Sequence, residues 1–207
     1  MDRPVRLAVL LSGSGTTLQN FIDHIAARRL LAEIVVVVSS RIDAGGLARA
    51  RQAGIHAVAV PRKQFPDVDQ FNDALHAELA HFTFDLIVLA GFLSPFQPRQ
   101  RYAGHVLNIH PALIPAFCGK GLYGEKVHRA VIESGVRVSG CTVHFADDQY
   151  DHGPIILQGT VPVLDDDTPE TLAARVHALE NDLYPEAVRL WAEGRLEIVG
   201  SRVIIKK

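Results

Sequence analysis

Short apolar runs alternate along the chain with longer segments in which apolar residues recur at helical spacing. Such runs predict buried strands, because a parallel strand covered on both faces carries few polar residues. Strands that alternate with helices are typical of βαβ units with right-handed crossovers. The sequence therefore predicts an α/β, single-domain, Rossmann-like fold, in which a mostly parallel twisted sheet carries helices on both faces. The predicted strands are Leu7–Leu11, Ile34–Val38, His56–Val60, Leu86–Ala90, a run beginning at Val106, Ser139–Phe145 and Ile155–Val163.

Helical segments fill the connections between these strands. Thr168 and Pro169 are residue types favoured at the N-cap and the first position of a helix, and they open the last and longest one. Pro162 has no N–H to give to a neighbouring strand, which favours an edge position. The chain closes with a predicted hairpin. The helices are expected after Thr17 and at Gly46–Ala53, Asp69–Phe82 and Lys126–Ser134, and the hairpin strands at Arg195–Val199 and Arg202–Ile205.

The strand that begins at Val106 carries Asn108 and His110 at its end. Side chains two residues apart project from the same face of a strand, so we expect these two to lie side by side. Pro111 ends the pairing, because proline has no N–H for a sheet ladder. Open α/β sheets bind ligands at the carboxyl ends of their strands. An amide can donate to a developing oxyanion and an imidazole can carry a proton, so the pair is a candidate catalytic site.

A glycine-rich loop, Ser12–Thr17, connects the first strand to the first helix. The N–H groups of Gly15, Thr16 and Thr17, with the two threonine hydroxyls, suit a phosphate monoester at the positive end of that helix. No lysine follows the glycines as a Walker A loop requires, and Leu18 stands where a dinucleotide fingerprint has its third glycine. A dehydrogenase is thereby disfavoured, whereas a purely structural turn stays open.

Composition narrows the class of protein. The chain has 207 residues, 48% hydrophobic and 21% charged, as in a globular protein with one sizeable core. A formal net charge of −2 argues against a general nucleic-acid or membrane binder. The two cysteines make no disulfide framework and we see no signal peptide, so we expect a cytoplasmic protein that acts on small molecules. The ten histidines include no set with convincing metal-ligand spacing.

The segment Asn108-Ile109-His110-Pro111, followed by Leu113 and Pro115, resembles the signature of the folate-dependent formyltransferases. The likeness extends from about residue 6 to about residue 191. It implies one formyltransferase domain over residues 1–207, with a phosphate-binding half of about 1–100 and a folate and catalytic half of about 101–207. It further implies transfer of the formyl group of 10-formyltetrahydrofolate to the primary amine of glycinamide ribonucleotide in purine biosynthesis. A monomer or homodimer without a metal is expected.

The same resemblance implies roles for individual residues. Asn108 donates to the formyl oxygen, and Asp151 favours a protonated His110, so that the imidazole, a water and the carboxylate relay a proton. On pattern alone, the acidic stretch 147–151 is typical of a solvated turn. The implied catalytic residues are Asn108, His110 and Asp151; the implied ribonucleotide-binding residues are Gly15, Thr16, Thr17, His177 and Glu180; the implied folate-binding residues are Phe92, Leu93, Ser94, Pro95, Asn108, Asp147, Asp148, Gln149 and Tyr150.

The chain departs from the family pattern in three loops. Thr17 stands where relatives often have asparagine, and Cys118 where proline is common. Leu93 and Ser94 stand where many relatives have methionine and a basic residue in a longer loop. We expect the backbone donors of the phosphate loop to survive the first change. Transfer to an amine needs no covalent intermediate, so we do not expect Cys118 to be a nucleophile.

Three other activities stay open. A formyltetrahydrofolate deformylase uses the same three catalytic side chains with water as the nucleophile, and carries an extra N-terminal regulatory domain. A methionyl-tRNA formyltransferase adds a C-terminal tRNA-binding domain, whereas about 16 residues follow Trp191 here. A phosphosugar- or nucleotide-binding module that kept the fold would bind without turnover. His144 matches a family histidine near the site without an assigned role, and His152 is expected to be exposed.

Overall fold

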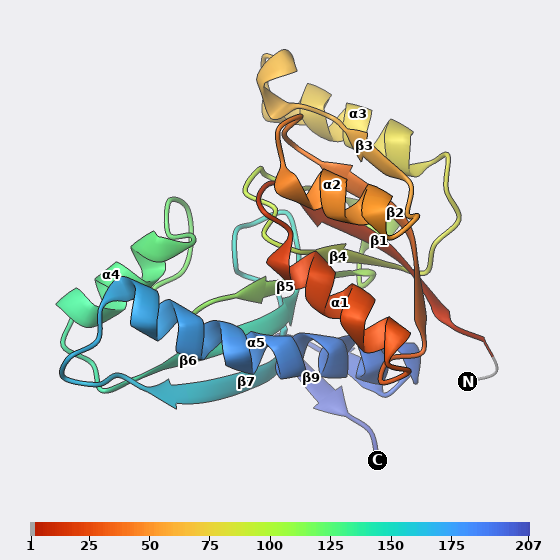
Figure 1. The fold of residues 1–207 in the computed structure, drawn as a ribbon. Coiled ribbons are helices and arrows are strands. Elements are labelled where there is room, and N and C mark those ends of the chain that lie inside the picture. The colour runs from red at the N-terminus through yellow and green to blue at the C-terminus, as the bar shows by residue number, and fades with distance from the viewer. Residues whose placement is uncertain (1–2) are drawn as a thin grey trace. The chain divides into compact units, whose positions relative to one another are not determined.

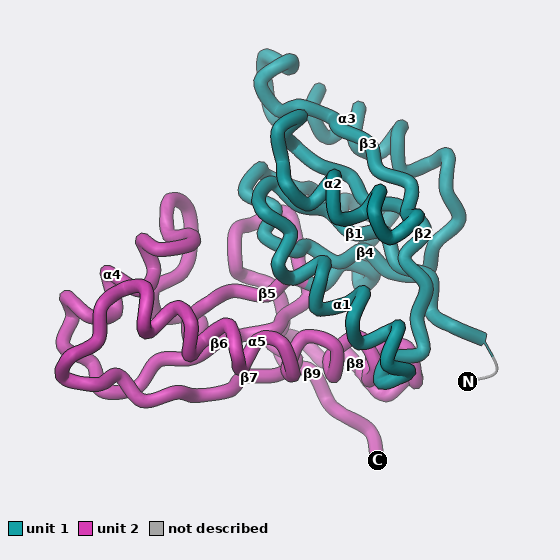
Figure 2. The backbone as a smooth tube through the Cα atoms, in the orientation of Figure 1, with its two compact units in different colours: residues 1–107 teal, residues 108–207 magenta. Residues whose placement is uncertain are grey.

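The computed structural model describes residues 3–207, which form two compact units that meet in the sequence between Leu107 and Asn108 (Figure 2). The first two positions of the predicted domain lie outside the described residues. The boundary between the units falls inside strand β5 (Val106–His110), so this one strand carries residues of both. Each unit combines strands with helices.

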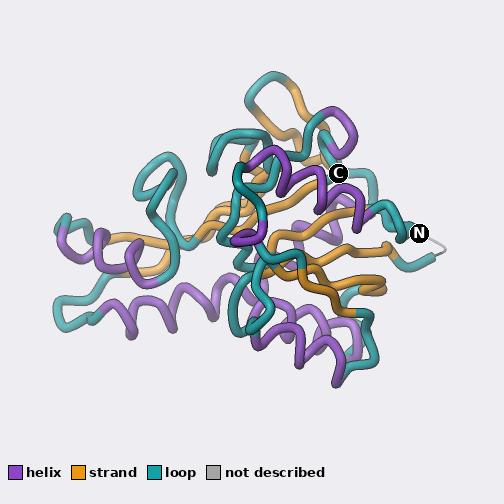
Figure 3. Tube along the Cα trace, turned by 90° about the horizontal axis from the view of Figure 1, so that it is seen from above, coloured by secondary structure: helices purple, strands orange, loops and turns teal. Residues whose placement is uncertain are grey.

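In the first unit the strands follow the order β3-β2-β1-β4, with β5 next to β4. β1 pairs in parallel with both β2 and β4, and β2 pairs in parallel with β3. Figures 1 and 3 show helices on both faces of these strands, with α1 and α2 on one face and α3 on the other. The elements are β1 (Val5–Leu11), α1 (Thr16–Ala26), β2 (Ala32–Ser39), α2 (Gly45–Gln52), β3 (Ala57–Ala59), the 3₁₀ turn η1 (Arg62–Gln64), α3 (Val68–Leu79), β4 (Leu86–Leu89) and the 3₁₀ turn η2 (Gln100–Tyr102).

The apolar runs of the first unit form its core, as their composition predicts. Residues 7–11 of β1 and 36–38 of β2 are fully buried, because helices cover both faces of the sheet. The third strand is shorter than its apolar run. His56 and Val60 flank it and make single hydrogen bonds to β2, through Val37 and Ser39 respectively. The helices expected in this unit are all present, and Asp67 caps the N-terminus of α3 by accepting from the Gln70 N–H.

In the second unit the strand order is β5-β6-β7-β9-β8. β6 pairs with β7 and β8 pairs with β9 in antiparallel hairpins, so the sheet is mixed here. β9 pairs in parallel with β7 only at Ile155↔Arg202, far from Pro162, which therefore lies at a local edge as expected. The elements are α4 (Glu125–Glu133), β6 (Val138–Phe145), β7 (Ile155–Pro162), α5 (Pro169–Ala192), β8 (Leu196–Val199) and β9 (Arg202–Ile205).

Helix α5 packs against β6, β7 and α4 and covers the core of the second unit. It begins as the sequence predicts: Thr168 accepts from the Thr171 N–H, and the Thr171 hydroxyl accepts in return from the Thr168 N–H. Its buried face meets residues of α4 and β6 in an apolar cluster. The cluster consists of Val131, Cys141, Val161, Leu172 and Val176.

Among residues 3–207, no helix has the length and apolar character needed to cross a membrane.

Candidate active site

Asn108 and His110 end β5 and reach the same carboxylate. The Asn108 Nδ2 atom lies 3.4 Å from Asp151 Oδ1, and the His110 Nδ1 atom lies 3.5 Å from Asp151 Oδ2. The strand stops at His110, where Pro111 follows. The period-two spacing of the strand therefore brings the two side chains together, as predicted, and all three residues belong to the second unit.

The side chain of Asp151 is largely buried although it lies in an acidic loop. Only 10% of its side chain is exposed, and Oδ2 accepts a hydrogen bond of 2.9 Å from the Gly119 N–H. Its backbone φ is +53°, in the left-handed region that aspartate and asparagine tolerate better than most residues. The solvated-turn interpretation is thus wrong for Asp151. It holds for the neighbouring residues 148–150, which are exposed.

The hydrogen bonds of His110 fix the position of one of its ring protons. Nε2 lies 2.8 Å from the carbonyl oxygen of Phe117. A carbonyl oxygen can only accept, so Nε2 carries a proton. The nitrogen left to gain or lose a proton is Nδ1, and this atom faces Asp151. A protonated Nδ1 can donate to the carboxylate, which makes His110 and Asp151 a pair suited to moving a proton.

His144, on β6, orients the amide of Asn108. Its Nδ1 donates to the Phe145 carbonyl oxygen over 2.8 Å, so Nε2 is free to accept from Asn108 Nδ2 at 3.0 Å. Burial lowers the pKa of His144, which keeps the ring neutral and the Nε2 lone pair available. One N–H of the Asn108 amide is thereby held, while the second has, within the described part of the chain, only the long contact to Asp151. Sequence reasoning placed His144 near the site but gave it no role.

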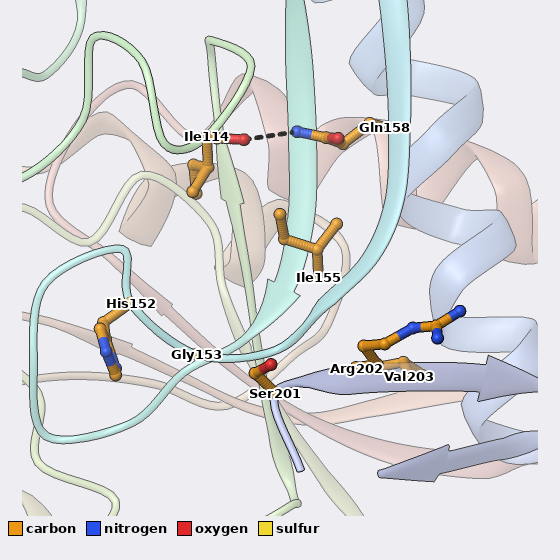
Figure 4. A pocket seen from close by; sticks show the side chains of 8 residues that line it. All are labelled: Ile114, His152, Gly153, Ile155, Gln158, Ser201, Arg202 and Val203. Carbon is orange, nitrogen blue, oxygen red and sulfur yellow. Dashed lines mark hydrogen bonds between the residues drawn. The ribbon is translucent and has the colours of Figure 1, made fainter. Parts of the chain in front are cut away.

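The turn that follows β5 is held by side chains of β6 and β7. Thr142 donates to the Ala112 carbonyl oxygen at 2.7 Å and accepts from the Ile114 N–H at 3.0 Å. Gln158 donates to the Ile114 carbonyl oxygen at 3.0 Å, the contact drawn in Figure 4. These contacts fix the end of the strand that carries His110. Thr142 and Gln158 could not be recognised from the sequence, because their partners are backbone atoms distant in sequence.

A surface pocket with a volume of about 360 Å³ lies beside this turn. Figure 4 shows the side chains that line it. Its lining includes none of the residues Asn108, His110 and Asp151. His152 lies at it, and its side chain is 63% exposed, as expected, with Nδ1 2.8 Å from Asp147 Oδ2. The chemistry-bearing cluster and this pocket are therefore separate features. The pocket is lined by Ile114, His152, Gly153, Ile155, Gln158, Ser201, Arg202 and Val203.

Cys118 lies in the glycine-rich loop after β5 and is not set up as a nucleophile. Its thiol donates to the Pro115 carbonyl oxygen at 3.2 Å. Burial, and then the neighbouring Asp151 charge, raise the pKa of this thiol, so it stays protonated near neutral pH. Among residues 3–207, no three His, Cys, Asp or Glu side chains are grouped so as to hold a metal ion.

On α5, His177 and Glu180 face each other one turn apart, as predicted. The His177 Nδ1 and Glu180 Oε2 atoms are 2.6 Å apart, and 57% of the His177 side chain but only 9% of the Glu180 side chain is exposed. This hydrogen bond raises the pKa of His177. A buried carboxylate with a second oxygen can accept from a ligand hydroxyl.

His128, on α4, is buried and its Nδ1 is an unpartnered polar atom among the described residues. Burial lowers its pKa to about 4, below the ordinary 6.5. Between these two pH values the ring binds a proton in the unfolded chain but not in the folded one. The folded state is therefore favoured most above pH 6.5, and this contribution to the free energy of unfolding is lost as the pH falls toward 4. From pH 7.5 to pH 5 the free energy of unfolding should fall by about 2 kcal/mol from this residue.

Replacing His128 with leucine should remove that part of the pH dependence. Urea denaturation at pH 7.5 and pH 5 measures it, with exposed His81→Leu as the matched control that keeps the wild-type dependence. An unchanged difference between the two pH values in His128→Leu would show that the ring is not buried in its neutral form.

The glycine-rich loop of the first unit leads into α1. Gly15 is the N-cap residue with φ +78°, and a Cβ there would lie 2.6 Å from the Gly46 Cα, so only glycine fits. Thr16 and Thr17 are the first residues of the helix, whose N–H groups have no partner within it. Arg49, which the sequence analysis did not single out, donates through Nε to the Ser14 carbonyl oxygen at 2.9 Å. Its guanidinium adds positive charge beside these donors.

Loop 91–97 follows β4 in the same unit. The Ser12 N–H donates to the Gly91 carbonyl oxygen at 3.0 Å, which ties the start of the loop to the end of β1. The ring of Phe92 is stacked with that of Phe71 of α3 at 6.3 Å between centroids, while the Leu93 side chain is 50% exposed. In the second unit, Tyr150 is likewise 48% exposed.

Comparison with known proteins identifies relatives along nearly the whole chain. A family model described as formyl transferase matches residues 5–188. Phosphoribosylglycinamide formyltransferase of Haemophilus influenzae is 40% identical over 195 residues, which cover 93% of this chain and 90% of that protein. Trifunctional purine biosynthetic protein adenosine-3 of Gallus gallus is 41% identical over 94% of this chain, which spans 19% of that protein's length. The crystal structure of glycinamide ribonucleotide transformylase 1 from Symbiobacterium toebii matches with a TM-score of 0.90 and 44% identity, covering 100% of this chain and 96% of that one.

Proposed function

Because the chain belongs to the formyl transferase family, we propose that it transfers the formyl group of 10-formyltetrahydrofolate to the amine of N1-(5-phospho-D-ribosyl)glycinamide. The product is the N-formyl ribonucleotide of purine biosynthesis. The observation that supports this best is the meeting of Asn108 and His110 at the largely buried carboxylate of Asp151. An amide donor, an imidazole and a carboxylate in one cluster are what formyl transfer to an amine requires.

Asn108 supports the attack step. The amine nitrogen forms a bond to the formyl carbon, and negative charge develops on the formyl oxygen. Asn108 has one N–H held by His144 and a second that makes only the 3.4 Å contact with Asp151, so the second N–H can donate to that oxygen. A protonated His110 adds positive charge. One such donor is typically worth about 3–4 kcal/mol of barrier.

His110 and Asp151 support the proton transfers. The attacking amine loses a proton, and the folate N10 gains one as its bond to the formyl carbon breaks, so no net proton is consumed. The Nδ1 atom of His110 and the Asp151 carboxylate lie 3.5 Å apart and can relay this proton, directly or through a water. No covalent enzyme intermediate is needed.

The substrate-binding residues are assigned on the same basis. The N–H groups at the start of α1 suit the ribose phosphate, at Gly15, Thr16 and Thr17. His177 and Glu180 suit the ribose hydroxyls, and Glu180 is the stronger candidate because its carboxylate is buried. For the folate we assign Phe92, Leu93, Ser94 and Pro95 of loop 91–97, Asn108, and Asp147, Asp148, Gln149 and Tyr150 of the loop before β7.

The setting of the reaction is also proposed. We propose that residues 1–207 act as one catalytic domain in the cytoplasm, as a monomer or homodimer, on small molecules and without a metal ion. The chain spans 19% of the Gallus gallus trifunctional protein and 90% of the Haemophilus influenzae enzyme, and the transferase activity is what we propose for these residues.

A spectrophotometric assay with a 10-formylfolate donor tests the function. We expect loss of the formyl group from the folate only when the glycinamide ribonucleotide is present, with one formyl group transferred for each ribonucleotide consumed. Folate turnover without the ribonucleotide would instead identify a deformylase, in which water is the nucleophile. Binding of either substrate without turnover would indicate a binding module and withdraw the proposal.

A further inference from the structure

Loop 91–97 is tied to the body of the first unit at every second residue. Gly91 accepts from the Ser12 N–H, and the Leu93 N–H donates to the Ser12 hydroxyl oxygen at 2.9 Å. Pro95 and Gln97 are bound by side chains of α3. Within residues 3–207, the intervening backbone groups of Phe92 and Ser94 make no hydrogen bond. The loop therefore presents an edge of unpaired backbone groups while its other edge is fixed.

Asn72 is the central anchor of this loop. Its Nδ2 donates to the Pro95 carbonyl oxygen at 3.2 Å and to the Val68 carbonyl oxygen at 2.9 Å, while its Oδ1 accepts from the Gln97 N–H at 2.7 Å. The side chain is fully buried. An amide alone offers donors and an acceptor in this space, because a carboxylate cannot donate and an aliphatic side chain can do neither.

His76 follows one turn later on the same face of α3. Its Nε2 lies 2.8 Å from the Gln97 carbonyl oxygen, so Nε2 carries a proton and donates. Burial lowers the pKa of this ring, which keeps it neutral near pH 7. The imidazole also packs against Phe96 and Tyr102, at 5.7 and 5.0 Å between ring centroids. Both polar atoms of the Gln97 backbone are thus bound by α3.

We propose that Asn72 and His76 are positioning residues that hold loop 91–97 so that the free backbone groups of Phe92 and Ser94 face the folate ring. The proposal rests on the proposed function, in which this loop binds the folate. A pterin carries ring N–H and amino donors, a carbonyl and ring nitrogens along one edge. Backbone N–H and C=O groups whose neighbours on both sides are already held in place suit such an edge, because little conformational entropy is lost on binding.

The experiment compares Asn72→Leu with Leu79→Ala on the same helix. Leu79 is also fully buried, but no hydrogen bond joins its side chain to the loop, so it reproduces a loss of core stability alone. Asn72→Leu should raise KM and Kd for the 10-formylfolate donor on the order of tenfold. This is the change expected if only about one molecule in ten holds the loop in the binding-competent conformation. KM for the ribonucleotide and kcat should change little in both variants.

Two further readouts separate positioning from folding. Hydrogen exchange of the peptide that contains Gln97 should be about ten times faster in Asn72→Leu than in Leu79→Ala, because the bond to Gln97 is lost only in the former. His76→Phe removes the N–H donor to Gln97 and should raise KM for the folate, whereas His76→Gln keeps an N–H donor and should restore it. These two variants test the same proposal if Asn72→Leu does not fold.

Each outcome decides between the two proposals. Weaker folate binding, faster local exchange and rescue by His76→Gln support the positioning role. Unchanged folate affinity in Asn72→Leu and His76→Phe, in an active enzyme, overturns it. If the wild type binds the donor by calorimetry but transfers no formyl group, the proposed function fails, and the positioning role is judged on the measured Kd. If the wild type does not bind the donor at all, both fail.

Discussion

Replacing Asp151 with asparagine should lower kcat about a thousandfold, within the range that a positioned acid–base group contributes. The substitution removes the negative charge that faces His110 Nδ1 at 3.5 Å, so a protonated imidazole is no longer matched by a carboxylate. It also removes the acceptor of the migrating proton. Asparagine tolerates the left-handed backbone at this position, so the fold should persist.

Steady-state kinetics on Asp151→Asn, with both substrates varied, measures the effect. KM for each substrate should stay within about threefold, because the loss concerns an interaction made in the transition state. Asp165→Asn is the matched control: its side chain is 86% exposed and pairs with Arg137 at the surface, so activity should be unaltered. Retention of wild-type kcat in Asp151→Asn would remove the carboxylate from the mechanism.

Replacing Asn108 with aspartate should lower kcat about 10²–10³-fold through the lost oxyanion donor alone. The substitution keeps the size of the side chain but removes both N–H groups. It leaves His144 Nε2 without its donor and brings a second carboxylate close to Asp151, at the position of the 3.4 Å contact. Repulsion between the two carboxylates adds to the loss.

A pH profile distinguishes these two effects in Asn108→Asp. Two neighbouring carboxylates bind a proton more readily than one alone, so lowering the pH should restore part of the activity of this variant. Asn108→Leu cannot regain activity in this way and is the comparison variant. Equal kcat in Asn108→Asp and the wild type at pH 8 would show that the amide donates to no developing charge.

The positions of the strands could be predicted because runs of neighbouring apolar residues indicate which segments are buried. Leu7–Leu11 contains no polar residue, and a short apolar run of that kind seldom forms anything other than a buried strand. The spacing of Asn108 and His110 was informative for the same reason, since a strand fixes its own side-chain period. The ends of strands were less predictable: the flanks of β3 depend on single hydrogen bonds to β2.

The contacts that complete the candidate site could not be predicted from pattern. Asp151 lies in a polar loop, and its burial depends on how the chain folds back after Phe145. No periodic pattern in the neighbouring sequence indicates this. The His144 contact with Asn108 joins residues 36 positions apart, and it exists only in the observed arrangement of strands. The anchoring of loop 91–97 by Asn72 is of the same kind, because a buried asparagine in a helix resembles an ordinary surface residue in sequence.

The loop after β5 forms a hydrogen bond with each of the two residues of the proposed proton relay. The Phe117 carbonyl oxygen accepts from His110 Nε2, and the Gly119 N–H donates to Asp151 Oδ2. The backbone thus presents an acceptor and a donor, two residues apart, to an imidazole and a carboxylate. An inhibitor could copy this pattern: a compound with a carbonyl and an N–H at the same separation would replace the backbone atoms of the loop, and its affinity would depend on how readily residues 117–119 give up these contacts.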